Sequence, residues 1–428
     1  MVISSQAYKE QGMRKRLGVG LVALTISTAA CDSLLDVELP GQLPEESLLV
    51  PEMTEMMTLG SIADFECAYT SYILGAAGAS HEYIDASGWP AFIVFPTLQV
   101  FEDTGGVNTS GCTGATSFGF FRPLQTARFQ AEQAFTTIEG FTTAQVPRKD
   151  GLLATSAAIA GFVYATFGES WCEMAVNGGG LMTPAAVLTE AEGWFDKSIT
   201  HAAAAGGTVT AAGIPNVLHF ARLGRARVRL ARGNKAGAAE DAALVPENFL
   251  ATITRSSGTR DRWNNVYVNM TPNRYVTVGP NYRNLTVNGV ADPRVRVVNS
   301  GTISNDGVTP HWNQLKYTSD VQPIPLARWA EAQLILAEVK GGAAAVGHIN
   351  AVRARSGITP YAGGTEAQIQ AQIIEERRRE FFLEGRRHAD MLRYKVPFPT
   401  GNSHRGQPYG PTTCFPLSKA EKDTNPNI

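Results

Sequence analysis

The sequence has few cysteines and no excess of either charge. Its 428 residues include five Cys, too few for a small disulfide-dense domain. Lys and Arg total 37 against 39 Asp and Glu, and the resulting net charge of −2 excludes a dedicated nucleic-acid binder. The GxSxG, HExxH, Walker A and dinucleotide-binding motifs are also missing. We therefore expect no nucleic-acid partner, no cofactor and no metal ion.

Long apolar runs are missing after the N-terminal segment. No run of 18 apolar residues follows residue 30, so we expect no membrane span beyond that point. Hydrophobic residues nevertheless make up 44% of the chain, enough for a sizeable core. The 42 Gly and 23 Pro indicate long loops between packed elements, because one uninterrupted helical bundle would not tolerate so many.

Residues 1–30 are organised like a bacterial signal peptide. Residues 14–16 are basic, residues 17–30 carry no charge, and small residues directly precede Cys31. The apolar stretch is too short to span a bilayer comfortably. A cysteine at this position predicts a lipoprotein signal, with cleavage before Cys31 and a lipid on its thiol. Ordinary secretion with cleavage at the same bond is the alternative. Residues 31–428 are expected to form a single domain.

The other four cysteines are candidates for oxidation. They are Cys67, Cys112, Cys172 and Cys414, and outside the cytoplasm they can form two disulfides. Four cysteines allow three pairings, and the sequence does not choose among them. A metal site is the other interpretation, but no two of these cysteines are closely spaced and none has a nearby His.

Two segments of the chain match in register and indicate a helical repeat. Residues 221–231 and 327–337 carry small side chains at the same places, which lets helix axes approach closely. Each segment is followed by a Gly-containing break and a second Ala-rich helix, at residues 235–244 and 343–355. Each unit is thus an αα-hairpin of the size of a tetratricopeptide (TPR) repeat.

A weaker copy of this hairpin covers residues 154–168, with its partner helix at residues 189–205. Helical units are therefore expected at about 152–245 and 326–356. Residues 80–121 and 251–325 lack helical periodicity and are rich in Gly, Asn, Thr and Pro. The predicted fold is mainly α, with TPR-type hairpins as the scaffold, these two long loop insertions and a few short β-hairpins.

Residues 375–394 combine opposite charges with an apolar face. Five acids and five Arg lie between residues 375 and 390, which suits a salt-bridged helical corner better than a catalytic site. Gly385 is expected to break the segment into two helices. The spacing allows i,i+4 ion pairs between Glu375 and Arg379 and between Arg386 and Asp390. The residues expected to brace this ionic corner are Glu380, Glu384, Arg386 and Asp390.

Several short motifs in one order resemble the SusD/RagB family of lipoproteins from Gram-negative nutrient-uptake systems. Residues 326–338 (LARWAEAQLILAE) resemble its RyAE…LilAEA helix, and residues 350–357 (NAVRARSG) resemble its iNxVRxRAG motif. Residues 376–387 (ERRREFFLEGRR) resemble its ERrrELafEGxR segment, with DMLR following at residues 390–393. Further matches are DPR at 292–294, FPL at 415–417 and NP at 425–426.

The resemblance implies a TPR-containing α fold and a lipid-anchored position on the cell-surface side of the outer membrane. It implies that the protein captures a substrate for a SusC-like TonB-dependent transporter. Members of the family bind oligosaccharides, or in some cases peptides, and are not enzymes.

Aromatic residues of the two insertions are the candidate ligand contacts, because pyranose C–H faces stack on flat rings beside polar groups. In residues 251–325 the aromatic side chains are all Trp or Tyr, with no Phe. The first candidates are Trp89, Trp263 and Trp312, followed by Tyr83, Tyr267 and Tyr282.

Two other functions remain open on the sequence alone. A lipid-anchored glycoside hydrolase needs two carboxylates at one site, for which Glu82/Asp85 and Glu102/Asp103 are candidates, although acid pairs are common by chance. A TPR-type adaptor that binds only protein would leave its concave helical face open, and the two long insertions count against it.

The N-terminal pattern predicts covalent lipidation at Cys31. Cells that express the full chain and are fed labelled palmitate should incorporate label into the protein, and Cys31→Ala should abolish it. Equal labelling of the variant and the native chain would contradict lipidation at this thiol, and a secreted, unlabelled native chain would favour ordinary secretion.

Overall fold

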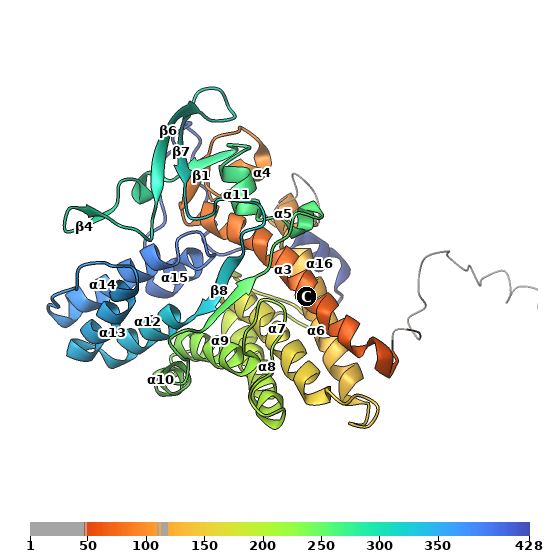
Figure 1. Ribbon diagram of the computed structural model, residues 1–428. Helices are drawn as coiled ribbons and strands as arrows, with labels where there is room; N and C mark the ends of the chain where they lie inside the picture. Colours follow the sequence, from red (N-terminus) through yellow and green to blue (C-terminus); the bar gives the residue numbers. More distant parts are fainter. Residues whose placement is uncertain (1–46, 48, 109–110, 113–118) are drawn as a thin grey trace, which may run out of the picture. The chain divides into compact units, whose positions relative to one another are not determined.

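The computed structural model describes Ser47 and residues 49–108, 111–112 and 119–428. The expected signal peptide and Cys31 lie outside these residues, so lipidation stays a prediction. Residues Val50–Ile428 form one compact unit. Element labels follow Figure 1.

Helices dominate the unit, as predicted, and the strands are few and short. The longer helices are α3 (Thr54–Ala79), α6 (Phe121–Glu139), α7 (Lys149–Ser170), α8 (Pro184–Ala204), α9 (Val217–Ala231), α10 (Lys235–Ala243), α12 (Trp329–Lys340), α13 (Gly342–Arg355), α14 (Glu366–Glu380) and α15 (Arg387–Tyr394). Shorter helices are α4 (Pro90–Ile93), α5 (Gly105–Asn108), α11 (Asn265–Met270) and α16 (Lys419–Thr424), with 3₁₀ turns η1 (Pro51–Met53), η2 (Arg260–Arg262) and η3 (Pro280–Tyr282).

The three predicted αα-hairpins are present. They are α7 with α8, α9 with α10, and α12 with α13. Figure 1 shows α6, α7, α8 and α9 side by side in one half of the unit and α12, α13 and α14 stacked in the other. The shared register of small residues in the sequence therefore identified real helical repeats.

Glycine at one repeat position explains how the first two hairpins pack. Gly161 of α7 and Gly224 of α9 both face the ring of Phe195 in α8. A Cβ atom would approach that ring to 2.8 Å at Gly161 and to 2.4 Å at Gly224, closer than real side chains allow. The buried Phe195 ring therefore fits between the two helices only because both positions lack a side chain.

Helix α7 is the central core helix of this half. It is long and apolar enough to cross a membrane by length and composition, but 94% of its most apolar window is buried inside the protein. Its apolar character is explained by burial on every side.

The two insertions meet in a small antiparallel pairing. Strand β1 (Tyr83–Asp85) comes from the first insertion and pairs with β3 (Val276–Val278) from the second, with Tyr83 opposite Val278. Within the second insertion β6 (Val297–Ile303) pairs with β7 (Pro310–Gln314), as drawn at the top of Figure 1. The remaining pairs are β2 (Leu250–Ile253) with β8 (Ile324–Arg328), and β4 (Thr286–Val287) with β5 (Val290–Ala291).

The four cysteines are all paired. Cys67 bonds to Cys112 and Cys172 bonds to Cys414. The first disulfide joins α3 to the first insertion, and the second joins the end of α7 to the C-terminal tail. The two disulfides use all four thiols, so the alternative of a metal site made from these cysteines is wrong.

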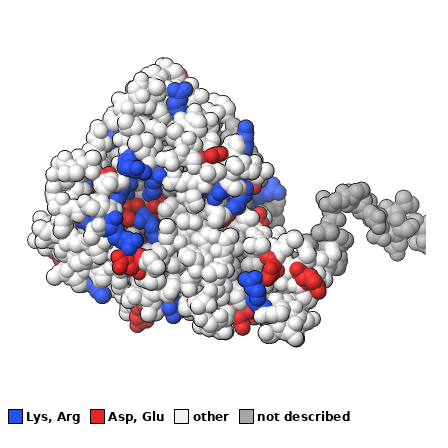
Figure 2. All heavy atoms as spheres, in the orientation of Figure 1, with Lys and Arg blue, Asp and Glu red and all other residues white. Residues whose placement is uncertain are grey.

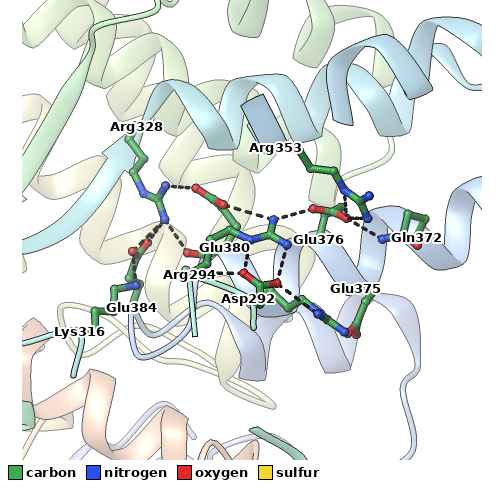
Figure 3. A network of polar contacts seen from close by, with 11 residues as sticks. Asp292, Arg294, Lys316, Arg328, Arg353, Gln372, Glu375, Glu376, Glu380 and Glu384 are labelled. Carbon is green, nitrogen blue, oxygen red and sulfur yellow. Dashed lines mark hydrogen bonds and ion pairs between the residues drawn. The ribbon is translucent and has the colours of Figure 1, made fainter. Parts of the chain in front are cut away.

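The charged corner around α14 and α15 is a buried network (Figure 3). Arg294 bonds to Asp292 through Nε and Nη2 at 3.0 and 2.9 Å and pairs with Glu376 at 2.6 Å. Arg353 of α13 bonds to the other oxygen of Glu376 at 2.6 Å. Burial alone would raise the pKa of Asp292, but hydrogen bonds and the charge of Arg294 outweigh it and lower that pKa.

The same network continues to the turn that follows α14. Arg328 bonds to Glu384 at 2.9 Å and also pairs with Glu380, while Lys316 donates to Glu384 at 2.7 Å. In Figure 2 Lys and Arg side chains gather around a hollow over α14 and α15, with acidic side chains inside it. The four residues predicted for this corner are all buried and all ion-paired, and the chain does break between α14 and α15 around Gly385.

One of the two predicted i,i+4 pairs is wrong. Glu375 and Arg379 do pair, at 2.5 Å. Arg386 instead pairs with Glu169 of α7 at 2.7 Å, and Asp390 pairs with Arg377 of α14 at 2.9 Å. Because Arg386 precedes α15 and is buried against α7, its partner comes from the core and not from its own helix.

Loss of one acid from this network should destabilise the fold. Glu384→Ala leaves Lys316 without its carboxylate in a buried setting and removes one of two acids from Arg328, so the free energy of unfolding should fall by about 3–5 kcal/mol. Denaturant titration measures this. Glu247→Ala is the matched control, because Glu247 pairs with Arg355 at the surface, and it should cost less than about 1 kcal/mol. Equal stability of both variants would show that Glu384 does not brace the corner.

Candidate functional site

Two of the six aromatic candidates cannot offer an open ring face on which a sugar could stack. Tyr83 is 0% exposed and Tyr282 is 2% exposed. The Tyr282 ring stacks on Phe382 with centroids 4.9 Å apart, and the Tyr83 side chain is part of the main core. The prediction that they form the aromatic binding surface is therefore wrong, because both rings serve packing.

Trp263, Trp312 and Tyr267 are half-buried and lie in different settings. Arg260 lies over the Trp263 ring, with its Cζ 5.6 Å from the centroid, and Arg283 lies over the Trp312 ring at 5.1 Å. The rings of Trp312 and Tyr267 pack against the main core. The structure does not bring these three rings together into one aromatic surface.

Trp89 is the candidate that the structure places at the surface. Its side chain is 42% exposed. The indole stacks on Tyr275 from the second insertion, with centroids 5.3 Å apart and planes inclined by 25°. The buried Phe92 supports the Tyr275 ring from another side, at 5.2 Å. A flat, partly open aromatic pair therefore lies where the two insertions meet.

A tight turn sets the position of Trp89. Asp85 ends β1, and its Oδ1 accepts hydrogen bonds from the backbone N–H groups of Ser87 and Gly88 at 3.1 and 3.2 Å. Ser87 Oγ in turn accepts the backbone N–H of Trp89. Pro90 then begins the short helix α4, where its fixed φ angle suits the first position. These local bonds hold the backbone of Trp89 without using its indole ring.

A charged cluster lies beside the aromatic pair. Arg405, from the C-terminal loop, pairs with Asp85 at 3.2 Å and with Asp306 of the β6–β7 hairpin. A Cβ atom built on Gly88 would lie 3.4 Å from Arg405 Nη1, so the guanidinium lies directly against the turn before Trp89. The Arg405 side chain is 26% exposed.

Asp306 is held in its ionised form. Partial burial would raise its pKa, but hydrogen bonds from Thr309 and Val308 and from Arg405 outweigh this and lower the pKa to about 2. The carboxylate of Asp306 is therefore charged at neutral pH.

Backbone hydrogen bonds join the segments that carry this cluster. The N–H of Ala86 donates to Tyr275 at 2.9 Å, and the N–H of Asp306 donates to Ala86 at 2.9 Å. We call the resulting surface the Trp89 platform, and it consists of Trp89, Tyr275, Asp85, Asp306 and Arg405. Its parts come from the first insertion, the second insertion and the C-terminal loop.

The chemistry of the platform is that of a carbohydrate contact. A flat ring covers the apolar C–H face of a pyranose, and neighbouring guanidinium and carboxylate groups exchange hydrogen bonds with hydroxyls. The sequence pointed to Trp89 as a ligand contact and to Asp85 only as part of a candidate acid pair. Tyr275 belongs to the aromatic set of the second insertion but carried no distinguishing signal, and the C-terminal loop was not considered.

The first of the two acid pairs proposed for a hydrolase, Glu82 and Asp85, does not form a common site. Glu82 is fully buried and accepts the N–H of Leu383 at 2.8 Å, while Asp85 is occupied by its turn and by Arg405. Glu102 and Asp103 are exposed and line a surface pocket of about 560 Å³ beside Lys419. Glu102 is ion-paired with Lys422 at 2.9 Å. Within the described part of the chain no cluster of His, Cys, Asp and Glu could hold a metal ion.

Comparison with known proteins finds similarity to one protein family over part of the chain. Residues 247–427 match the model of the SusD family. The starch-binding protein SusD of Bacteroides thetaiotaomicron is 35% identical over 127 residues, a match that spans 26% of this chain and 22% of that protein. The resemblance seen in the sequence motifs is thereby confirmed.

Solved structures extend the likeness to nearly the whole chain at the level of the fold. A SusD-like carbohydrate-binding protein of Bacteroides vulgatus superposes with a TM-score of 0.67 at 14% identity, covering 89% of this chain and 97% of that one. The surface glycan-binding protein A of Bacteroides thetaiotaomicron, solved with laminarihexaose, gives 0.63 at 13% identity, covering 88% and 98%. The mainly helical fold predicted from the sequence is the fold of these proteins.

The burial of Glu82, which directly precedes β1, makes the free energy of unfolding depend on pH. Burial raises the pKa of Glu82 to about 7, although the Leu383 N–H, Lys316 and Arg387 act to lower it. The folded state favours protonated Glu82. The contribution of this residue to the free energy of unfolding is therefore complete below the unfolded pKa near 4.5 and is lost as the pH rises through about 7. At pH 8, Glu82→Gln should be more stable than the native chain by roughly 3 kcal/mol, and at pH 4 the two should be equal.

Urea unfolding of both proteins at the two pH values tests this expectation. Glu247→Gln, at an exposed position, serves as the control and should change stability little at either pH. A stability difference between Glu82→Gln and the native chain that stays constant from pH 4 to pH 8 would show that the pKa of Glu82 is the same in the folded and unfolded states.

Proposed function

We propose that this chain, a SusD/RagB-type protein by its motifs, its family match and its fold, captures oligosaccharides on the Trp89 platform. The relatives described above are named as starch-binding, carbohydrate-binding and glycan-binding proteins, and one of them was solved with laminarihexaose. Oligopeptides are the second class of ligand, as the family resemblance implies.

The observation that carries this proposal is the exposed indole of Trp89 stacked on Tyr275 beside Arg405. An indole that is 42% exposed and fixed by a backbone turn loses little freedom when a sugar covers it. Arg405 is held between the carboxylates of Asp85 and Asp306, so its position next to the turn before Trp89 is fixed. These are the elements of a preformed sugar contact.

The wider role that we propose is nutrient uptake. The mature protein would be anchored by lipid at Cys31 to the outer membrane and would face the outside of the cell. It would pass its ligand to a SusC-like TonB-dependent transporter. The lipoprotein pattern at Cys31 and the SusD family match support this arrangement.

We further propose that the protein binds its ligand without transforming it. The buried state of Glu82 and the ion pairing of Asp85 and Glu102 leave these acids poorly placed to act as a hydrolytic pair. The adaptor alternative loses support as well, because both insertions contribute to the same hydrophobic core as the helical hairpins.

Truncation of Trp89 should abolish measurable glycan binding while the fold remains intact. Loss of one stacking ring costs about 1–3 kcal/mol by analogy with base–aromatic stacking, which raises Kd by about 5- to 150-fold. An uptake protein that must release its cargo is expected to have a Kd on the order of micromolar to millimolar. A glycan-array screen followed by calorimetry with the best ligand would measure the effect of Trp89→Ala.

Trp263→Ala is the matched control, since it removes the same ring from a half-buried position that makes no described contact with the platform. We expect it to bind like the native chain. Native-like binding by Trp89→Ala would place the ligand elsewhere, and a screen in which no glycan or peptide binds the native chain would contradict the proposed function.

A further inference from the structure

Arg387 differs from the other arginines of its segment. Arg377, Arg378, Arg379 and Arg386 each form an ion pair with a carboxylate. Arg387, at the start of α15, forms none with the described residues, and its buried Nη1 atom makes no hydrogen bond to them. A guanidinium that is partly withdrawn from water without an acid partner is costly, unless something else occupies the position.

Arg387 lines a pocket of about 450 Å³ that is separate from the Trp89 platform. Arg378 and Tyr282 lie on the polar side of this pocket, and Met391, Pro397 and Phe398 form its apolar wall. The hydroxyl of Tyr282 is buried next to Arg378, and its proton has no acceptor among the described residues. Two buried polar groups with unused hydrogen-bonding capacity thus belong to one small pocket.

The charges around the pocket do not cancel. Arg378 is neutralised by Glu375, which accepts two hydrogen bonds from it at 2.6 Å. His81 also lines the pocket, and burial lowers its pKa, so it is uncharged at neutral pH. Glu82 interacts electrostatically with Arg387 and Tyr282, and its pKa, raised to about 7, leaves a large part of it protonated near neutral pH. Arg387 therefore supplies one positive charge without a fixed counterion.

We propose that this pocket binds the carboxylate of an acidic sugar, with Arg387 as the charge partner and the Tyr282 hydroxyl as a second donor. A guanidinium matches a carboxylate in shape as well as charge, through parallel N–H···O bonds. The apolar wall of Met391 and Phe398 suits the C–H face of a sugar ring. The pocket volume lies in the range of small-molecule sites. The choice of a sugar rests on the proposed function, whereas the choice of a carboxylate rests on the pocket alone.

Calorimetry with D-glucuronate, D-glucose and acetate tests the proposal on the whole protein. D-glucuronate should bind the native chain at least about tenfold more tightly than D-glucose, because a hydrogen-bonded charge contributes about 1.5–3 kcal/mol. Acetate should bind more weakly than D-glucuronate, since it lacks the ring. Arg387→Gln should weaken D-glucuronate binding by about 10- to 150-fold.

Tyr282→Phe provides a second test that does not depend on the charge. The hydroxyl proton has no acceptor among the described residues, so removal of the hydroxyl should leave the melting temperature nearly unchanged, while D-glucuronate binding weakens by about fivefold. Arg122→Gln, which removes an exposed arginine, controls for the change in net charge and should bind D-glucuronate like the native chain.

The results separate this proposal from the platform. Equal affinity of the native chain for D-glucuronate and D-glucose would overturn it, as would native-like binding of D-glucuronate by both Arg387→Gln and Tyr282→Phe. If acetate binds as tightly as D-glucuronate, the assignment of a sugar ligand is overturned and the pocket is an anion site only. D-glucuronate binding that is lost in Trp89→Ala and kept in Arg387→Gln would assign the acid to the platform. If neutral glycans do not bind at the Trp89 platform, the outcome of this test does not change.

Discussion

The ion pairs around the turn between α14 and α15 are the constraint on which the arrangement of the molecule depends. Glu384 in this turn is bonded to Arg328 at the end of β8 and to Lys316 in the second insertion. The backbone of the turn is used as well, since Lys316 donates to the carbonyl of Phe382 and Tyr317 donates to that of Leu383. The N–H of Leu383 donates to Glu82 of the first insertion. One buried turn therefore positions both insertions relative to the helical scaffold.

This constraint reaches the platform through β1 and β3. Glu82 is followed directly by β1, which pairs with β3, and Trp89 and Tyr275 lie just beyond the ends of these strands. Neither aromatic residue touches the ionic turn. Their stacking is supported because β1 is tied to this buried turn through Glu82, and β3 is paired with β1. A rigid scaffold can thus present loop residues in a fixed geometry, which is how loops acquire binding roles.

The sequence predicted the scaffold well, because its signals are local. Small residues recurring at one register identified the hairpins, and Gly224 proved to be a point of close helix contact. The ionic corner was recognised by composition, but the partner of Arg386 was not, because Glu169 lies more than two hundred positions away on a core helix. Ion pairs between residues that are far apart in the sequence have no characteristic spacing, so the sequence does not reveal them.

The platform was predicted only in part, for a related reason. Tyr83 and Tyr282 look like ligand-binding aromatics in the sequence, yet their rings fill the core, and a tyrosine gives no sequence signal of which role it has. Arg405 joined the site from a C-terminal loop that has no motif of its own. The family motifs, by contrast, fall largely on one structural feature, since Asp292, Arg294, Arg353 and Glu376 meet in the ionic network.

The disulfide between Cys172 and Cys414 has a consequence for the order in which the chain matures. Ribosomes deliver the N-terminus first, so Cys67 and Cys112 are available to each other early, with 45 positions between them. Cys172 must wait until the chain is almost finished, because its partner follows 242 positions later. During that interval the thiol of Cys172 has no native partner and can exchange with the bond between Cys67 and Cys112. A thiol-exchange catalyst in the compartment where the chain folds would matter most for this late, long-range closure.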